Sequence, residues 1–138
     1  MPLISNAMMC LVVAMGNQAT LVARCGGSLT PAPHHVRLAH VELPATSSTH
    51  AKAARLSLRN LCLNKAAEIS PLGRDGDGFT LAHVHCADKD VEEHLLAEGL
   101  AHMKKMASFD AMELKVFQDA AQHAQLGLWS LGSAHRHH

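Results

Sequence analysis

The stretch that decides the fold runs over residues 34–63, HHVRLAHVELPATSSTHAKAARLSLRNLCL, and its hydrophobic period changes partway along. In the first part, Val36, Leu38 and His40 alternate with their neighbours, which is the two-residue period of a half-buried strand that Pro44 ends. In the second part, apolar side chains recur along one helix face, namely Ala54, Leu58, Leu61 and Cys62. The stretch therefore predicts a strand followed by a helix.

Shorter patterns on both sides predict four further strands. Two apolar runs, Cys10–Met15 and Thr20–Arg24, flank a turn at Gly16-Asn17-Gln18, which is the signature of a hairpin. Residues 65–72 and 79–86 alternate in the same way, and a glycine-rich turn joins them. These segments predict one hairpin before the 34–44 strand and a second after the helix.

Two more helices are predicted towards the end of the chain. Asp90 is followed by Glu93 in the arrangement of a capping box, and Gly99 ends that helix. The last helix is expected from about Ser108 to Gly127. Five short strands with a helix between the third and the fourth are the element order of an OB-fold barrel. We therefore expect an α+β protein, a five-stranded antiparallel barrel with three α-helices.

Length and composition indicate one folded domain. The chain has 138 residues, of which 48% are apolar and 17% charged, so a disordered or coiled-coil protein is excluded. We place the domain at residues 10–130, with an N-terminal extension at 1–9 and a flexible, histidine-rich tail at 131–138. The apolar run Met8–Met15 is too short to cross a bilayer, so no membrane partner is expected.

The charge balance argues against tight nucleic-acid binding. Twelve Lys and Arg offset twelve Asp and Glu, whereas dedicated nucleic-acid binders carry a basic excess. Tyrosine is absent and there is one tryptophan, so stacking platforms are scarce. Twelve histidines would make the protein basic only below about pH 6.5. The basic stripe of Lys52, Arg55 and Arg59 is interpreted as a solvated helix face.

The cysteines leave the compartment open. They lie too far apart for a CxxC motif, and none, one or two disulfides are compatible with the sequence; they are Cys10, Cys25, Cys62 and Cys86. A secretion signal would begin with a basic segment, but the first Lys or Arg is Arg24, so none is evident.

Ordered landmarks make the chain similar to the staphylococcal nuclease (thermonuclease-like) family over residues 11–130. The landmarks are Thr20-Leu21, VRLAHVELP at 36–44, AKAARLSLRNLC at 51–62, Asp75 to Gly78 followed by TLAHVHC at 80–86, VEEHLLAEGLA at 91–101, and GLWS at 127–130. The resemblance implies the OB-type barrel and Ca²⁺-dependent cleavage of DNA and RNA. Three cysteines also fall where exported bacterial members carry them, which implies an exported or periplasmic protein.

Of three positions that match the family's metal and phosphate groups, one is retained and two differ. Arg37 matches the first phosphate-binding arginine and is retained. Glu42 stands where the family has one metal-binding aspartate, and its carboxylate reaches one methylene further. Ala19 stands where the family has the other metal-binding aspartate, so that carboxylate is missing. One carboxylate alone holds Ca²⁺ poorly.

Two further matched positions have lost their functional groups. Ala45 replaces the glutamate that acts as general base, and Phe79 replaces the second arginine. The resemblance therefore implies a pseudo-nuclease, in which Arg37 and Phe79 contribute to weak binding of single-stranded DNA or RNA, of nucleotides, or of a protein. No cofactor is expected, and Ca²⁺ would be needed only if some activity remained.

Two alternatives for this region stay open. In the first, the domain is an active phosphodiesterase with a rearranged site, where Glu42 is ligand or base and Asp75 or Asp77 supplies a second carboxylate. In the second, Arg37 forms a structural ion pair with a carboxylate such as Glu42. Phe79 is interpreted as a hydrophobic patch that fills the cleft, with base stacking as its alternative.

The histidines suggest a separate metal hypothesis. His83 and His85 lie on one face of a strand with their Cα atoms about 6.6 Å apart, so they can share a transition metal. His34 or His35 would be a further ligand. The competing interpretation is that these are unliganded strand histidines, because no aligned Cys or carboxylate completes the set. The tail histidines would bind metal loosely; they are His135, His137 and His138.

Overall fold

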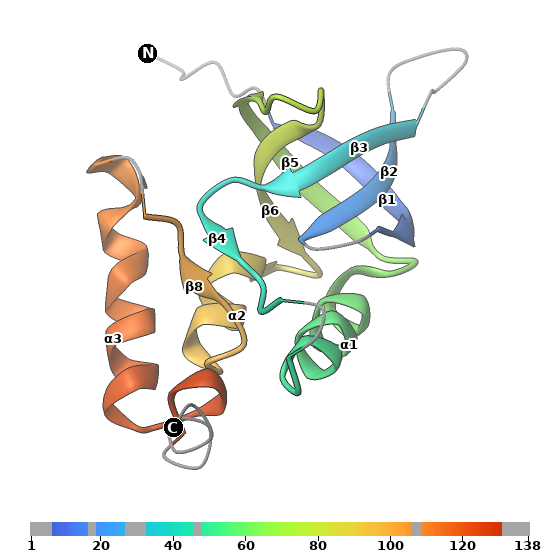
Figure 1. Ribbon diagram of the computed structural model, residues 1–138. Helices are drawn as coiled ribbons and strands as arrows, with labels where there is room; N and C mark the ends of the chain where they lie inside the picture. The colour runs from blue at the N-terminus through green and yellow to red at the C-terminus, as the bar shows by residue number, and fades with distance from the viewer. Residues whose placement is uncertain (1–6, 17–18, 27–32, 46–47, 106–108, 131–138) are drawn as a thin grey trace.

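The computed structural model describes residues 7–16, 19–26, 33–45, 48–105 and 109–130 (Figure 1). Its elements follow in the order β1 (Met8–Met15), β2 (Thr20–Cys25), β3 (Pro33–Leu38), β4 (Val41–Glu42), α1 (Ala51–Cys62), β5 (Ala66–Arg74), β6 (Thr80–Cys86), β7 (Lys89–Asp90), α2 (Val91–Ala97), β8 (His102–Met103), the 3₁₀ helix η1 (Phe109–Leu114), α3 (Lys115–His123) and the 3₁₀ helix η2 (Gly127–Trp129). The predicted α+β class with three α-helices is confirmed.

Five strands close into a barrel. They are hydrogen-bonded in the order β3-β2-β1-β5-β6, and β3 also pairs with β6. The predicted OB-type barrel is therefore confirmed, but the expectation that all its strands are antiparallel is wrong at the closure. There Val36 pairs with Thr80 and Leu38 with Ala82 in parallel register. The chain crosses from β3 through α1 to the β5–β6 hairpin, so β6 meets β3 running in the same direction.

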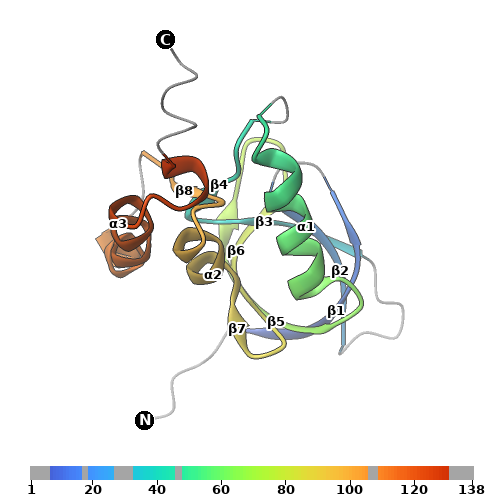
Figure 2. The same ribbon diagram turned by 90° about the horizontal axis from the view of Figure 1, so that it is seen from below.

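The barrel interior is filled by alternate residues of its strands. Val12, Leu21, Val36, Ile69 and Val84 are all fully buried. Each such side chain contributes about 1.5–3 kcal/mol by leaving water. Helix α1 lies at the lower end of the barrel in Figure 1 and is also seen against the barrel in Figure 2. Its apolar face is buried in the same core, as the helical spacing predicts.

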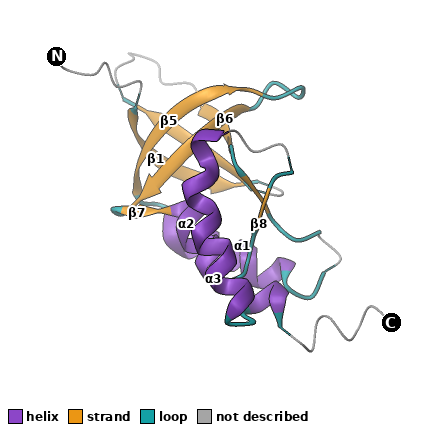
Figure 3. Cartoon of the chain, turned by 90° about the vertical axis from the view of Figure 1, so that its left-hand side faces the viewer, coloured by secondary structure: helices purple, strands orange, loops and turns teal. Residues whose placement is uncertain are grey.

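Helix α2 packs against the barrel at β6, and α3 packs on the other side of α2, away from the barrel (Figures 1 and 3). The predicted capping box is present, since the Asp90 carboxylate accepts a hydrogen bond from the Glu93 amide at 3.0 Å. The last helix begins as the 3₁₀ segment η1 and becomes α-helical only at Lys115.

The predicted strand over residues 34–44 is interrupted. Strand β3 ends at Leu38, and the short β4 pairs with β8 rather than with the barrel. At the bend, the Ala39 amide still donates to the Ala82 carbonyl, whereas the His40 amide donates to the carboxylate of Glu92 in α2. At the bend, the backbone hydrogen bonds of the sheet are thus replaced by a hydrogen bond to a side chain of α2. The alternation of apolar side chains in the sequence does not predict this change.

The question of disulfides is answered by two bridges. Cys10–Cys25 joins β1 to β2, and Cys62–Cys86 joins the end of α1 to β6. They close loops with sequence separations of 15 and 24 residues. Loop-closure entropy of this size stabilises a fold by about 3 kcal/mol for each bridge.

Some predicted features lie outside the described residues. They include Asn17 and Gln18 of the hairpin turn, residues 27–32 of the following loop, and the tail at 131–138. Within the described ranges, no helix is long and apolar enough to cross a membrane.

The end of α2 and the start of η2 approach each other through two glycines. Gly99 and Gly127 both have positive φ, +71° and +51°, and the Leu128 amide donates to the Gly99 carbonyl at 2.8 Å. A Cβ atom at Gly99 would overlap the backbone carbonyl of Leu126. This contact anchors the C-terminal segment and requires glycine.

We expect Gly99→Ala to lower the free energy of unfolding by at least about 2 kcal/mol, because positive φ and a backbone clash both oppose a side chain. Gly73→Ala is the matched control, since Gly73 lacks positive φ and its added Cβ meets nothing within 4 Å. Guanidinium unfolding followed by circular dichroism measures both. Equal stability of the two variants would contradict the close approach.

Candidate functional site

A cleft of about 520 Å³ opens where β3, β4 and the β5–β6 turn meet. Its lining residues are Ala19, Arg37, Val41, Glu42, Leu43, Asp75, Asp77 and Lys104. Three of the sequence-predicted positions, Ala19, Arg37 and Glu42, are thus brought together around one hollow. Ala45 is not among the lining residues, and Phe79 reaches the site through its contact with Arg37.

Arg37 is held at the centre of this site by contacts on several sides. Its Nη1 lies 2.6 Å from Asp75 Oδ2, and its Nε lies 3.5 Å from Thr20 Oγ1. Its guanidinium carbon sits 4.2 Å from the centre of the Phe79 ring, which is cation–π contact. The interpretation that Arg37 forms an ion pair with a carboxylate is confirmed, but the partner is Asp75 rather than Glu42, which was named as an example.

Asp75 organises the turn that precedes β6. Its Oδ1 accepts hydrogen bonds from the amides of Asp77 and Phe79, at 2.9 and 3.0 Å. Gly78, at a φ of +85°, lets the chain turn back so that the Asp75 amide reaches the Phe79 carbonyl. Burial raises the pKa of Asp75, but these two amides and the Arg37 guanidinium outweigh it and lower the pKa below its usual value. Both carboxylate oxygens are therefore engaged.

Asp77 and Glu42 take a smaller part. The Asp77 carboxylate is 77% exposed, and its Oδ2 lies 3.6 Å from Arg37 Nη1. Glu42 is exposed on β4, and it lies opposite His102 of β8 in the register of the two strands. Among the described residues, no set of three potential metal ligands includes Glu42, Asp75 or Asp77. The side chains of the cleft do not fit a Ca²⁺ site, since Ca²⁺ takes six to eight oxygen ligands.

Ala19 and Ala45, the matched positions without an acid, differ in exposure. Ala19 is 3% exposed, and its carbonyl accepts from the Leu38 amide at 3.0 Å, which ties it to β3. Ala45 is exposed and accepts a backbone hydrogen bond from Ser48. Neither methyl group can bind a cation or move a proton. The cleft thus keeps Arg37, whereas the two matched positions Ala19 and Ala45 carry no acid.

A second polar cluster lies where the bend after β3 meets β6 and α2. Glu92 is 0% exposed, and its Oε1 lies 2.8 Å from Nδ1 of His83 and 3.1 Å from Nδ1 of His40. Its Oε2 accepts the His40 amide at 2.7 Å. Sequence reasoning identified His83 but missed Glu92 and His40. The helical spacing could have found Glu92, because it lies three residues before Leu95 and four before Leu96. That spacing places it on the buried face of α2.

His83 is also bound on its other side. Its Nε2 lies 2.9 Å from Asp90 Oδ2, while His85 Nε2 lies 3.9 Å from the same oxygen. The hydrogen bonds to Asp90 and then to Glu92 raise the pKa of His83 to about 10, although burial alone would lower it. Burial raises the pKa of Glu92, but the hydrogen bonds from the His40 and His83 rings and from the His40 amide lower it on balance.

The predicted histidine set is only partly assembled. His83 and His85 do face each other, with ring centres 5.1 Å apart. His34 and His35 belong to neither of the two potential ligand groups found among the described residues, which are His40–His83–Glu92 and His83–His85–Asp90. The His35 ring instead lies 6.0 Å from that of Phe79.

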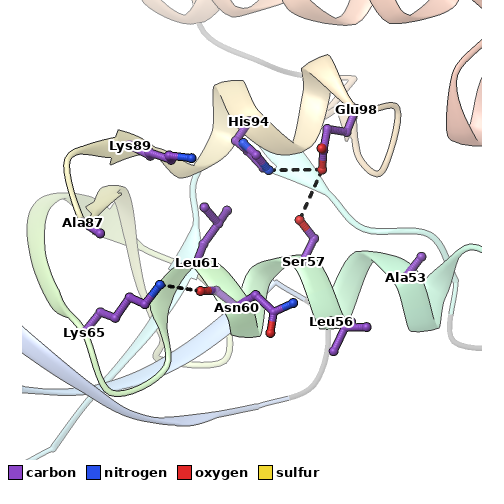
Figure 4. A pocket seen from close by; sticks show the side chains of 10 residues that line it. All are labelled: Ala53, Leu56, Ser57, Asn60, Leu61, Lys65, Ala87, Lys89, His94 and Glu98. Atoms are coloured by element: carbon purple, nitrogen blue, oxygen red, sulfur yellow. Dashed lines mark hydrogen bonds and ion pairs between the residues drawn. The ribbon is translucent and has the colours of Figure 1, made fainter.

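A further hollow of about 470 Å³ lies between α1 and α2 (Figure 4). Its polar groups bind one another: Glu98 Oε1 lies 3.1 Å from His94 Nε2 and accepts from Ser57, and the Lys65 ammonium donates to the Asn60 carbonyl. None of the candidate catalytic, metal-binding or phosphate-binding residues from the sequence lines it. The basic side chains of α1, Lys52, Arg55 and Arg59, are exposed, as a solvated face predicts.

Comparison with known proteins agrees with this architecture. Residues 35–131 match the family model described as staphylococcal nuclease homologue. An uncharacterized endonuclease of Haemophilus influenzae is 27% identical over 121 residues, which are 88% of this chain and 66% of that protein. Staphylococcal nuclease domain-containing protein 1 of Schizosaccharomyces pombe is 29% identical over 117 residues, 75% of this chain.

The chain spans just under two thirds of the length of the Haemophilus influenzae protein and 13% of the length of the Schizosaccharomyces pombe protein. The family match begins within β3, at residue 35, and ends shortly after η2, at residue 131. It therefore includes Arg37, the Asp75 turn and α2. Because the family model matches more than half of the chain, the chain belongs to the staphylococcal nuclease family.

Proposed function

We propose that this domain binds single-stranded DNA, RNA or nucleotides weakly through Arg37, and that it has lost phosphodiester hydrolysis. One observation carries the proposal. Arg37 stands in the cleft of a nuclease fold with its guanidinium bound to Asp75 and covering Phe79, while Ala19 and Ala45 stand at the positions matched to acids. The endonuclease name of the Haemophilus influenzae relative supports a nucleic-acid ligand.

The loss of hydrolysis follows from what the missing groups would supply. A preorganised charge that stabilises the transition state accelerates a reaction about 10²–10³-fold, and a general base about 10²–10⁴-fold. These factors do not simply multiply, because such groups act as a unit. Phe79 supplies no charge and Ala45 no base, and Glu42 alone holds Ca²⁺ poorly. We therefore propose no resident cofactor.

The charges of the cleft account for weak binding. Arg37 and Lys104 face three acidic residues, Glu42, Asp75 and Asp77, so the cleft carries a small negative excess. The described hydrogen bonds of Arg37 use Nη1 and Nε, and its two Nη2 donors remain for a phosphate oxygen. A phosphate therefore competes with Asp75 for the guanidinium. Phe79 acts as a support for Arg37, because the guanidinium already covers its ring.

Arg37→Ala should weaken binding of a labelled single-stranded 12-mer about tenfold, since a hydrogen bond to a charged group contributes roughly 1.5–3 kcal/mol. Fluorescence anisotropy in low salt with Ca²⁺ measures the affinity, and a denaturing gel should show an intact probe. Arg55→Ala is the matched control, because Arg55 is an exposed arginine on α1. Its affinity should equal that of the wild type. An equal loss in both variants would place the ligand elsewhere.

Asp75→Asn should raise the affinity for the same probe several-fold. The substitution removes the charge that binds Arg37, and the Asn carbonyl oxygen still accepts the amides of Asp77 and Phe79. Asp77→Asn removes one negative charge from the same cleft without the 2.6 Å contact, so it should raise the affinity less. Equal gains would show that net charge alone matters and that Asp75 does not compete for Arg37.

A second candidate function is hydrolysis by a rearranged site. It is favoured by the presence of Glu42, Asp75 and Asp77 around one cleft. It is weakened by the engagement of both Asp75 oxygens and by the exposure of Glu42. Shortening of the probe that needs Ca²⁺ and is abolished by Glu42→Gln would support this candidate over simple binding.

A further inference from the structure

We propose that His40, His83 and Glu92 form a binding site for a transition-metal ion such as Zn²⁺, with Asp90 as the residue that orients His83. The site is separate from the cleft around Arg37. It joins three parts of the chain: the bend between β3 and β4, strand β6, and the first turn of α2.

The ligand atoms already lie close to metal-binding geometry. One ring nitrogen of His40, one of His83 and a Glu92 oxygen all lie within 4.8 Å of one another. The ring nitrogens in contact with Glu92 Oε1 are both Nδ1. A tetrahedral Zn²⁺ with bonds of about 2.0–2.1 Å needs its ligand atoms roughly 3.3 Å apart. The distances from Glu92 Oε1 to the two rings are 2.8 and 3.1 Å, so only small movements would admit the ion.

The chemistry of the donors suits a borderline-soft cation. Two imidazoles and one carboxylate are a set that Zn²⁺ and neighbouring divalent metals accept, whereas Ca²⁺ and Mg²⁺ prefer oxygen alone. Glu92 is fully buried, and a buried carboxylate is costly unless positive charge compensates it. The His40 amide fixes the carboxylate orientation by donating to Oε2. Three protein ligands would leave one position for water or another ligand.

The position of Asp90 adds an independent argument. Both ring nitrogens of His83 face carboxylate oxygens, Nδ1 towards Glu92 at 2.8 Å and Nε2 towards Asp90 at 2.9 Å. A neutral imidazole has one N–H and cannot donate to both. The His83 ring therefore needs, besides the N–H on Nε2, either a second proton or a metal ion on Nδ1. With the metal there, Nε2–H donates to Asp90, as ligating histidines usually donate to a carboxylate.

A competing set shares the same histidine. His83, His85 and Asp90 also offer three ligand atoms within 4.8 Å of one another. Their side chains are more exposed, at 39% for His85 and 12% for Asp90, and His85 lies 3.9 Å from the Asp90 oxygen. The buried Glu92 carboxylate and its shorter contacts favour the first set. His40→Gln and His85→Gln distinguish the two.

The test uses the full-length chain in which His135, His137 and His138 are replaced by Gln, so that the tail does not bind metal. Isothermal titration with ZnCl₂ should show one ion per chain, and the same ion should raise the Tm by several degrees. Co²⁺ in the same protein should give visible absorption bands of a low-coordinate site. Absence of one-to-one Zn²⁺ binding in this protein would overturn the proposal and identify a proton as the charge on His83.

Variants in this background assign the ligands. Glu92→Gln and His40→Gln should each lower the Zn²⁺ affinity more than tenfold, whereas His85→Gln should leave it unchanged. Asp90→Asn should lower it about tenfold while keeping the helix cap, because Asn also caps helices well. Loss of binding in His85→Gln with retention in His40→Gln would overturn the assignment.

Discussion

The parallel pairing of β3 with β6 is the constraint on which both polar clusters depend. It closes the barrel and places Arg37 opposite Leu81, beside the turn that carries Asp75. Further along the same pair, the Ala39 amide binds the Ala82 carbonyl, so that His40 and His83 emerge next to each other. A register shift of one residue would turn these side chains to the opposite face. One hydrogen-bonded seam therefore sets the cleft and the histidine cluster together.

In the cleft, the charge of Arg37 is compensated by residues of the cleft itself. Asp75 supplies the counter-charge to Arg37, and Phe79 supplies an aromatic face where the family resemblance implies a second guanidinium. Arg37 is partly buried and shares the cleft with Ala19, where the family has an acid. The ion pair with Asp75, in the turn before β6, compensates its charge instead. These contacts hold Arg37 in place, and the competition from Asp75 accounts for the weakness of the proposed ligand binding.

Local sequence patterns predicted the main strands and helices, but they did not predict contacts between residues far apart in the sequence. The alternation of Val36 and Leu38, and the helical spacing that includes Leu58, located a strand and a helix that the structure confirms. The parallel closure, the disulfide partners and the Arg37–Asp75 pair join residues far apart in sequence, so no local period reports them. Glu92 was missed because a charged residue within a helix is ordinarily assigned to the solvent face.

We propose that the cleft has the shape of a nuclease site but lacks the groups for hydrolysis. The most direct measurement is single-turnover cleavage of labelled single-stranded DNA in Ca²⁺ by the wild-type chain and by the variant Ala19→Asp/Ala45→Glu/Phe79→Arg. We predict no cleavage above the buffer blank for the wild type and measurable Ca²⁺-dependent cleavage for the variant. Wild-type cleavage that requires Ca²⁺ and disappears in Arg37→Ala would contradict the account.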